Sequence, residues 1–312
     1  MPAPDREPVT ARIAVDLLGG DHAPAVVVDG ALRACQADPA LHLILVGPTD
    51  AAGELLAALD PAAHARVTTL ALSKEPDAET GVRTAVLAVA QGAADAVVSA
   101  GNTGATVTSA ALSLGRWPGV RRPPLAAVLP TEAGRLVLLD VGSSVDPDAP
   151  TLATHARLGA AYASVVHRVA EPRVGLLTIG TERGKGDRLR RELPRILSRL
   201  ALPGGARYAG LVEGNDVVLG AAADVVVTDG FTGNVLLKGL ETAYARFGAP
   251  GSPELAPPRA AILLGVDGIV VVCHGAAEGA DVAAGIAFAA DLHRRAAVAA
   301  IEEMINEVSH DE

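Results

Sequence analysis

The sequence predicts an α/β protein with a mostly parallel sheet that is covered by helices. The chain has 312 residues, of which 50% are hydrophobic and only 2% aromatic, so Val, Leu, Ile and Ala are expected to build its core. Short β-branched runs alternate with Ala-, Leu- and Arg-rich stretches that have helical spacing. Most of these runs are apolar at every position, which indicates strands buried on both faces, as in parallel sheets.

Ten strands are predicted from these apolar runs, and most of them end at Gly, Asp or Asn. In a parallel α/β sheet, ligands bind beyond the carboxyl ends of the strands, so the polar residues that follow each run are the candidates for a site. The predicted strands cover residues 12–16, 42–46, 67–72, 96–99, 125–129, 136–140, 174–178, 208–212, 225–228 and 269–273.

Residues 12–312 are expected to form a single domain after a disordered tail at residues 1–11. The tail is polar and lacks the apolar stretch of a signal peptide. The clearest break in composition is a Pro/Gly-rich loop at 247–258. A second break, at 115–124, carries the only Trp and three arginines; we interpret it as a solvated charged turn rather than a docking patch for an acidic partner.

Charge and cysteine content exclude several classes of function. A net charge of −10 and a pI near 5.3 give no general attraction for nucleic acid or anionic lipid, so an anionic ligand must be held locally. The two cysteines provide neither a disulfide framework nor a metal-binding CxxC spacing, which fits a reducing cytoplasm and no metal. Residues 96–115 are uncharged but rich in Ser, Thr, Asn and Gly, so we expect no membrane span there. Membrane association is expected to be weak or absent.

One motif occurs twice: "ADAVVSAGNTGAT" at 94–106 and "ADVVVTDGFTGNV" at 223–235 each lead a buried strand into Gly-x-Thr-Gly. Such a turn before a helix leaves unpaired backbone N–H groups, which bind anions, and its glycines let the backbone approach a ligand. Two copies in the same register predict two anion-holding turns in one cleft, for a phosphate-like ligand. The patterns GxxxxGK[ST] and, after the first strand, GxGxxG are absent, which weakens ATP and NAD interpretations.

Polar residues follow other predicted strands in the same way. The chain has only three lysines against twenty-three arginines, yet two of the lysines lie in or just after a Gly-rich motif. An ammonium group can approach a phosphate as a point charge, which favours a functional role for these two, Lys185 and Lys238.

Three aspartates at strand ends, Asp16, Asp140 and Asp229, are as able to hold loops through backbone N–H bonds as to act in catalysis. Cys273 is expected to be a small buried hydrophobe, because neighbours in a strand such as Cys273 and His274 point to opposite faces.

Seven polar and Gly-rich motifs occur between about residue 12 and residue 290: "VDLLGGDHAP", "VSAGNTGA", "LLDVGSSVD", "VGLLTIGTERGKGD", "LVEGNDV", "VVTDGFTGNVLLKGLE" and "LLGVDGIVVVCHG". In these motifs and in their order, the chain resembles the bacterial phosphate acyltransferase family, which transfers acyl groups from acyl carrier protein to phosphate. The resemblance implies a three-layer α/β/α sandwich similar to isocitrate and isopropylmalate dehydrogenases and to phosphotransacetylase. It further implies a cofactor-free homodimer that converts an acyl carrier protein thioester and inorganic phosphate into acyl phosphate for phospholipid synthesis.

Phosphate is already a nucleophile near neutral pH, so such an enzyme needs mainly positioning and donors for the developing oxyanion. His274 is a candidate to orient phosphate or protonate the leaving thiol, and Lys185 to neutralise the carbonyl oxygen. One anion is expected at the first turn, and the phosphate of the carrier's phosphopantetheine arm at the second, although which turn holds which anion stays open. The expected catalytic residues are Lys185, His274, Asn102 and Asn234. The expected phosphate- and substrate-binding residues are Gly19, Gly20, Asp21, Ser99, Gly101, Thr103, Gly104, Asp140, Gly142, Ser143, Gly180, Thr181, Gly184, Thr228, Asp229, Gly230, Thr232, Gly233 and Lys238.

The sequence also departs from the family pattern. A basic R-x-K-x-SS stretch is reduced to "GVRTAVLAVAQGAADA", "VGAN" becomes "VGSS", "HGSSD" becomes "HGAAE", and the helical segment before "LLGV" is reduced to the loop at 248–258. These losses keep two alternatives open: a paralogue that transfers the acyl group to another acceptor or to water, and a non-catalytic module that binds carrier protein or phosphate. A dehydrogenase ranks last. Acyl chain length and the identity of the carrier cannot be read from the sequence.

Overall fold

The computed structural model describes residues 9–72, 78–182, 184–250 and 260–310. They divide into two compact units: unit 1 comprises Met1–Leu114 and Gly268–Ala296, and unit 2 comprises Gly115–Asp267 and Ala297–Glu312. Whether the two units fold as one domain, as expected for residues 12–312, stays a prediction. Ala11 already belongs to the first strand, and most of the expected tail lies outside the described residues.

Unit 1 contains a fully parallel sheet. Its strands are, in spatial order, β3 (Val67–Ala71), β2 (Leu41–Gly47), β1 (Ala11–Asp16), β4 (Ala96–Ser99) and β11 (Ile269–Cys273). Every residue of β4 and β11 is buried, as their continuous apolar runs predict. Because the strands are parallel, the loops that follow β1, β4 and β11 emerge side by side at one edge.

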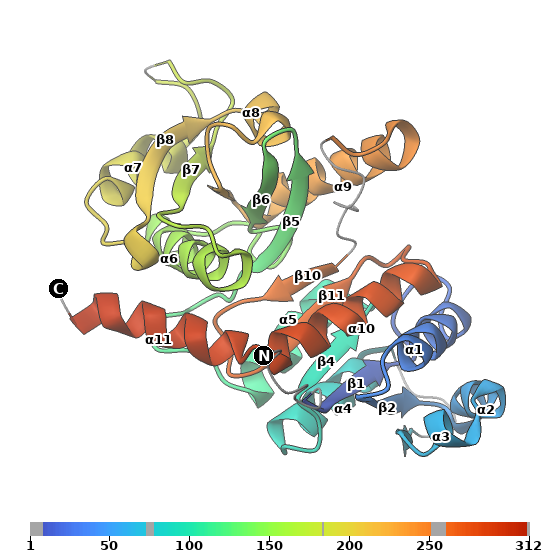
Figure 1. The fold of residues 1–312 in the computed structure, drawn as a ribbon. Helices are drawn as coiled ribbons and strands as arrows, with labels where there is room; N and C mark the ends of the chain where they lie inside the picture. Colours follow the sequence, from blue (N-terminus) through green and yellow to red (C-terminus); the bar gives the residue numbers. More distant parts are fainter. Residues whose placement is uncertain (1–8, 73–77, 183, 251–259, 311–312) are drawn as a thin grey trace, which may run out of the picture. The chain divides into compact units, whose positions relative to one another are not determined.

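Helices cover both faces of this sheet (Figure 1). Helices α1 (Ala25–Ala37) and α10 (Gly279–Arg294) pack on each other, and so do α4 (Ala78–Ala90) and α5 (Thr103–Ser113). The strand order places the two pairs on opposite faces of the sheet. Connections between parallel strands are right-handed, and the chain moves one way along the sheet from β1 through α1 to β2 but the other way from β3 through α4 to β4. Helices α2 (Thr49–Ala58) and α3 (Pro61–His64) connect β2 to β3.

Unit 2 contains a mixed sheet. Its strands are, in spatial order, β10 (Ala260–Leu263), β5 (Leu125–Thr131), β6 (Gly134–Leu139), β9 (Val225–Val227), β7 (Arg173–Leu177) and β8 (Arg207–Val212). Strands β6, β9, β7 and β8 are parallel, whereas β5 runs antiparallel to both of its neighbours. The prediction of a mostly parallel sheet is therefore confirmed, with β5 as the antiparallel exception.

The helices of unit 2 also lie on two sides of their sheet (Figure 1). One side carries α6 (Ala149–His167) and α7 (Arg188–Leu197), which pack on each other; α11 (Ala297–His310) and the 3-10 turn η1 (Pro203–Gly205) contact α6. By the same right-handed rule, α8 (Gly214–Leu219) and α9 (Gly230–Phe247) lie on the other side. No helix in the described part of the chain is both long and apolar enough to cross a membrane.

The two breaks in composition have different outcomes. Helix α9 ends at Phe247, and most of the Pro/Gly-rich segment at 247–258 lies outside the described residues. At 115–124 the Trp117 side chain is buried, while the exposed Arg121 pairs with Asp148. This pairing fits the interpretation of the segment as a charged turn.

Candidate functional site

In unit 1, the loops that follow three neighbouring strands meet at the carboxyl edge of the sheet. A Cβ atom on Gly19, after β1, would lie 2.5 Å from the Gly101 nitrogen and 2.9 Å from the Ser99 Oγ, both at the end of β4. The Asp21 amide donates to the carbonyl of Gly275, after β11, at 2.8 Å. The structure therefore brings the motifs "LLGGD", "SAGNTG" and "CHG" together, and the first two touch through their backbones.

A buried carboxylate fixes the first Gly-x-Thr-Gly turn. Asp16 is fully buried at the end of β1 and accepts hydrogen bonds from the Ser99 Oγ at 2.7 Å and from the Leu18 amide at 3.1 Å. The Ser99 Oγ in turn accepts the Gly101 amide at 3.0 Å. Burial raises the pKa of Asp16 to about 6, although the bonds from Ser99 and Leu18 oppose that shift. Ser99 and Gly101 thus hold the turn itself in place.

The start of α5 offers the unpaired amides that an anion requires. The Asn102 side chain caps the helix by accepting the Ala105 amide at 2.9 Å. Within the described residues, the amides of Asn102, Thr103 and Gly104 have no hydrogen-bond partner. These three N–H groups at the positive end of an eleven-residue helix form the arrangement that binds phosphate groups in many proteins.

His274 is half-buried directly after β11. Its Nδ1 atom accepts the Ala276 amide at 3.1 Å, so in the neutral ring the hydrogen is carried by Nε2. The preceding Cys273 is buried, and that burial raises the pKa of its thiol to about 12, which leaves almost no thiolate at neutral pH. The expectation that Cys273 packs as a small hydrophobe fits this environment.

In unit 2, the loop after β6 is held by Asp140, which is fully buried. Its Oδ1 accepts the amides of Leu125, Gly142 and Ser143 at 3.0–3.1 Å, and its Oδ2 accepts the Ser144 amide at 2.6 Å. With four backbone donors bound, the carboxylate shapes this loop. Of the two roles considered for Asp140, the structure supports the one in which it holds a loop.

The second Gly-x-Thr-Gly turn differs from the first because three of its four amides, all but that of Phe231, are already paired. Asp229 caps α9 by accepting the Thr232 amide and hydroxyl, each at 2.8 Å. The Gly230 amide donates to the Ser144 carbonyl at 2.7 Å, and the Gly233 amide to the Asp229 carbonyl at 3.0 Å. The Asn234 side chain donates to the carbonyl of residue 141 at 3.0 Å. Most of the backbone amides at the start of α9 are therefore bonded within unit 2, whereas those at the start of α5 are open.

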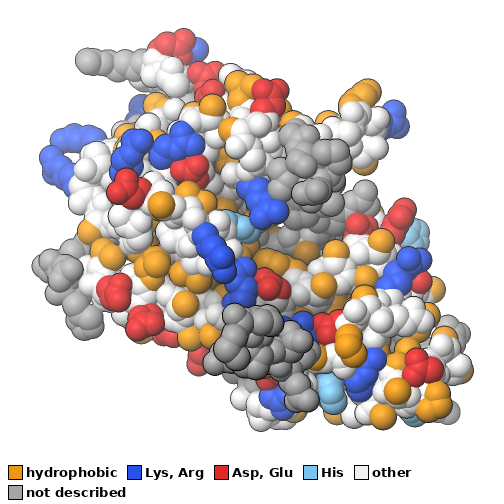
Figure 2. Space-filling model, in the orientation of Figure 1, with side chains coloured by type: hydrophobic (Ala, Val, Ile, Leu, Met, Phe, Trp, Pro, Cys, Tyr) orange, Lys and Arg blue, Asp and Glu red, His pale blue; other side chains and the backbone are white. Residues whose placement is uncertain are grey.

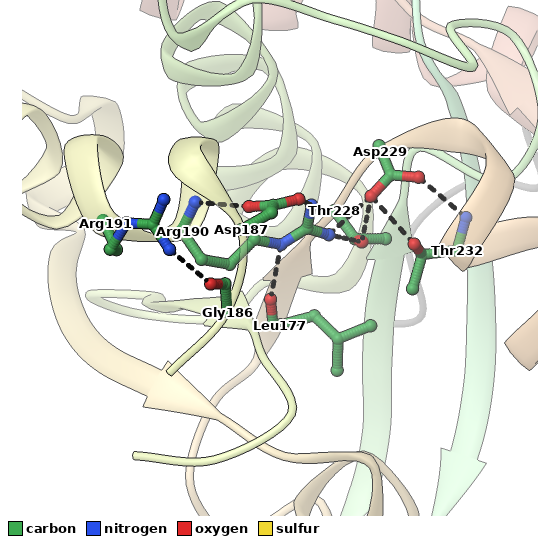
Figure 3. A network of polar contacts seen from close by, with 8 residues as sticks. All are labelled: Leu177, Gly186, Asp187, Arg190, Arg191, Thr228, Asp229 and Thr232. Carbon is green, nitrogen blue, oxygen red and sulfur yellow. Dashed lines mark hydrogen bonds and ion pairs between the residues drawn. The ribbon is translucent and has the colours of Figure 1, made fainter. Parts of the chain in front are cut away.

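Arg190 on α7 connects the second turn to the loop after β7 (Figure 3). Its Nη2 lies 2.5 Å from the Asp229 Oδ2 and 2.8 Å from the Thr228 Oγ1. Its Nη1 lies 2.9 Å from the Asp187 Oδ2, and its Nε donates to the Leu177 carbonyl at 3.1 Å. Burial alone would raise the pKa of Asp229, but hydrogen bonds from Thr232 and Arg190 outweigh it and hold that pKa below its ordinary value.

Our sequence interpretation missed Arg190, because it lies in the Arg-rich stretch "DRLRREL", which reads as a solvated helix face. Its spacing carries the signal that could have identified it. Arg190, Leu193 and Leu197 follow an i, i+3, i+7 pattern, and all three are buried on one face of α7.

Lys185 is exposed in the loop between β7 and α7. A Cβ atom on Gly180 would lie 3.3 Å from the Lys185 Cγ and 2.6 Å from the Glu182 Oε2, so these side chains fold back over that glycine. Thr181 and Gly184 are exposed in the same loop, and Lys238 is exposed two turns into α9. The roles of these residues stay predictions.

Two cavities in unit 2 meet at the Arg190 network. The first, of about 640 Å³, is lined by residues 145–149, by several residues of α7 and by the start of α9, and it carries five carboxylates against two arginines. The second, of about 740 Å³, is mainly apolar. Both are lined by Asp187, Arg190, Phe231 and Thr232, whereas Lys185 lines neither. An excess of carboxylates disfavours a phosphate in the first cavity.

Charged side chains are mixed over the face shown in Figure 2, where basic and acidic groups lie among each other and among apolar ones. Such mixing fits the expectation that binding of an anion is local. In the described part of the chain, no group of three or more His, Cys, Asp or Glu side chains could hold a metal ion.

Comparison with solved structures identifies the class of fold. A branched-chain phosphotransacylase from Enterococcus faecalis V583 superposes with a TM-score of 0.63 at 17% identity, over 91% of this chain and 99% of that one. A EutD phosphotransacetylase from Staphylococcus aureus gives 0.60 at 17% identity, over 93% and 94%. A 4-hydroxythreonine-4-phosphate dehydrogenase from Klebsiella pneumoniae gives 0.55 at 16% identity, over 93% and 99%. The predicted fold, the α/β fold of phosphotransacetylases and related dehydrogenases, is therefore confirmed.

Comparison of sequences identifies the family. Residues 11–249 match the family described as "Fatty acid synthesis protein". The phosphate acyltransferase of Thermobifida fusca is 40% identical, over 96% of this chain and 93% of its own length. That of Bacillus subtilis is 42% identical, over 74% and 71%. The chain belongs to the phosphate acyltransferase family, as its motifs indicate.

Proposed function

We propose that this phosphate acyltransferase moves a fatty acyl group from the thioester of acyl carrier protein to inorganic phosphate, and so supplies acyl phosphate for phospholipid synthesis. The observation that carries the proposal is the first Gly-x-Thr-Gly turn. There, three unpaired amides from Asn102 to Gly104 start α5, and the Asp16–Ser99–Gly101 chain of hydrogen bonds fixes the turn. In a family of phosphate acyltransferases, the ligand that such a turn suits best is the acceptor phosphate.

The proposed reaction is a direct displacement. A phosphate oxygen attacks the thioester carbonyl carbon, a carbon–oxygen bond forms, the carbon–sulfur bond breaks, and the carrier thiol leaves with a proton. The protein contributes mainly by holding phosphate against the carbonyl and by offering donors to the developing oxyanion. No acylated serine or cysteine is needed, in agreement with the suppressed ionisation of the Cys273 thiol.

In this proposal the two Gly-x-Thr-Gly turns have different roles. The open amides at α5 favour inorganic phosphate there, whereas the paired amides at α9 favour a structural role for Asp229, Gly230 and Gly233. In this proposal the Nε2–H of His274 orients phosphate or protonates the leaving sulfur, and Lys185 neutralises the carbonyl oxygen. Operation as a cytoplasmic homodimer is part of the proposal and rests on the family resemblance.

The experiment incubates the protein with acyl carrier protein in the presence and absence of inorganic phosphate. It measures the release of carrier thiol and traps acyl phosphate with hydroxylamine. We expect thiol release that depends on phosphate and equals the trapped product. Release that is independent of phosphate would identify another acceptor or water. Carrier binding without release would identify a non-catalytic module.

A further inference from the structure

The second cavity of unit 2 is a mainly apolar groove beside the first turns of α9, which we name the α9 groove. It has a volume of about 740 Å³ and is lined by Leu177, Thr178, Ile179, Gly186, Asp187, Arg190, Glu213, Gly214, Phe231, Thr232, Val235 and Leu236. Three large apolar side chains in this lining are exposed: Ile179 by 79%, Phe231 by 64% and Val235 by 58%. Such a cluster of exposed apolar side chains around one hollow marks a binding surface.

The local geometry explains why these side chains share a wall. Phe231 and Val235 are four residues apart on α9 and therefore project from the same face of the helix. Ile179 approaches from the loop after β7, and Leu177 ends that strand. Phe231 leaves most of its ring in solvent, although the burial of aromatic area is among the largest gains that packing offers.

The polar groups of the α9 groove are engaged with one another. Arg190, the cation in its lining, is bonded to Asp229, Thr228 and Asp187 and to the Leu177 carbonyl. Thr232 is bonded to Asp229 through both its amide and its hydroxyl. The groove therefore combines apolar walls with a polar end whose hydrogen bonds are satisfied, which suits a ligand part without charge or hydrogen-bonding groups.

We propose that the α9 groove binds the acyl chain of the thioester substrate and that Val235, with Phe231 and Ile179, sets the preferred chain length. The inference rests on the proposed function, which requires an apolar site within reach of the carboxyl ends of the strands. The alternative occupant, the pantetheine arm, carries amide groups that need partners, and burying them unpaired costs free energy. A hydrocarbon chain instead binds about fourfold more tightly for each methylene group that leaves water.

The test replaces Val235 by Phe to fill the groove and uses Ala245→Phe as the matched control. Ala245 is exposed on the same helix and lies outside the groove lining, so the control adds a larger aromatic group without occupying the groove. Acyl carrier proteins loaded with chains from four to sixteen carbons are compared by kcat/KM for phosphate-dependent thiol release. We expect V235F to lose at least about tenfold with the longest chains and to keep the wild-type value with the shortest, while A245F follows the wild type.

A second variant covers the case in which V235F does not fold. Ile179→Asn changes an exposed loop residue, which the fold tolerates more readily, and we expect it to flatten the rise of kcat/KM with chain length. A loss that is equal at all chain lengths would assign the groove to the pantetheine arm and overturn the proposal, as would unchanged profiles in both variants. The proposed function would fail differently: the wild-type protein itself would release no thiol in response to phosphate with any chain.

Discussion

Arg190 and Asp229 form a buried ion pair in which the Nη2 and Oδ2 atoms lie 2.5 Å apart. The pair joins α7 to the cap of α9, and Asp187 and Thr228 complete the network around the guanidinium. A buried charge that loses its partner is left uncompensated, so the network is expected to be sensitive to the removal of either member.

We therefore expect Arg190→Ala to lower the free energy of unfolding by about 3 kcal/mol, because it leaves Asp229 buried without its cation. The matched control is Arg188→Ala on the same helix, whose pair with Glu192 is largely exposed, so we expect it to leave the free energy of unfolding nearly unchanged. Urea denaturation of the two variants measures the difference. Equal and small losses would contradict a supporting role for the Arg190 network.

The amide of Thr103 provides a test of the phosphate position. Thr103 is the first residue of α5, where proline is tolerated, and Asn102 before it has an extended backbone, with φ −61° and ψ 120°. Thr103→Pro removes one open N–H group without breaking a helical hydrogen bond, so we expect the KM for phosphate to rise at least about tenfold, the effect of one charge-assisted bond.

Thr103→Val is the control for this substitution, because it removes the hydroxyl and keeps the amide. Steady-state kinetics with phosphate as the varied substrate, together with circular dichroism of both variants, would measure the effect. A folded T103P protein with the wild-type KM would exclude the start of α5 as the phosphate site.

Asp16 makes stability depend on pH in a defined direction. Burial raises its pKa in the folded chain from 3.8 to about 6, so the folded state binds this proton more tightly than the unfolded state does. The resulting stabilisation is complete below about pH 4 and is lost as the pH rises through about 6. Asp16→Asn has no such titration, so the unfolding free energy of wild type relative to D16N should fall by up to about 3 kcal/mol across this interval.

Urea unfolding of both proteins at several pH values between 4 and 8 measures this difference. It should be constant above about pH 7, where Asp16 is ionised in both states. Profiles that run parallel throughout would show that Asp16 has its ordinary pKa in the folded protein.

Lys185 is expected to act on the reacting carbonyl. Lys185→Ala should slow turnover at saturating substrates at least tenfold, about 1.4 kcal/mol of transition-state stabilisation, with little change in unfolding free energy because the side chain is exposed. Lys185→Arg retains the charge but not the compact ammonium group, so we expect it to restore activity only in part. A turnover number unchanged in K185A would remove Lys185 from the mechanism.

The sequence was sufficient to predict the strands wherever burial is continuous. The spans of β4 and β11 were predicted to the residue, because every side chain of these strands is apolar or small and lies inside the sheet. Strand β10 was missed, since its four residues follow a Pro/Gly-rich segment that carries no strand signal. The antiparallel direction of β5 was not predicted either, because a run of apolar residues does not encode the direction of the neighbouring strand.

The sequence predicted the residue types of the candidate site, but it did not predict which groups in the site bond to one another. The sequence identified both Gly-x-Thr-Gly turns, but only hydrogen-bond geometry distinguishes the three open amides at the start of α5 from the three paired ones at the start of α9. The contact between Gly19 and Gly101 joins loops more than eighty residues apart, which no local pattern reports. Arg190 was missed because its burial depends on a partner from another helix.

The order of the two units along the chain has a consequence for folding during synthesis on the ribosome. Unit 1 is interrupted after Leu114 and resumes only at Gly268, where β11 begins one residue later and pairs with β4. While the intervening residues are translated, the nascent β4 presents one unpaired edge, a recognised starting point for misassociation. Unit 1 would therefore begin to fold first and be completed last, because unit 2 can assemble most of its sheet before unit 1 receives β11.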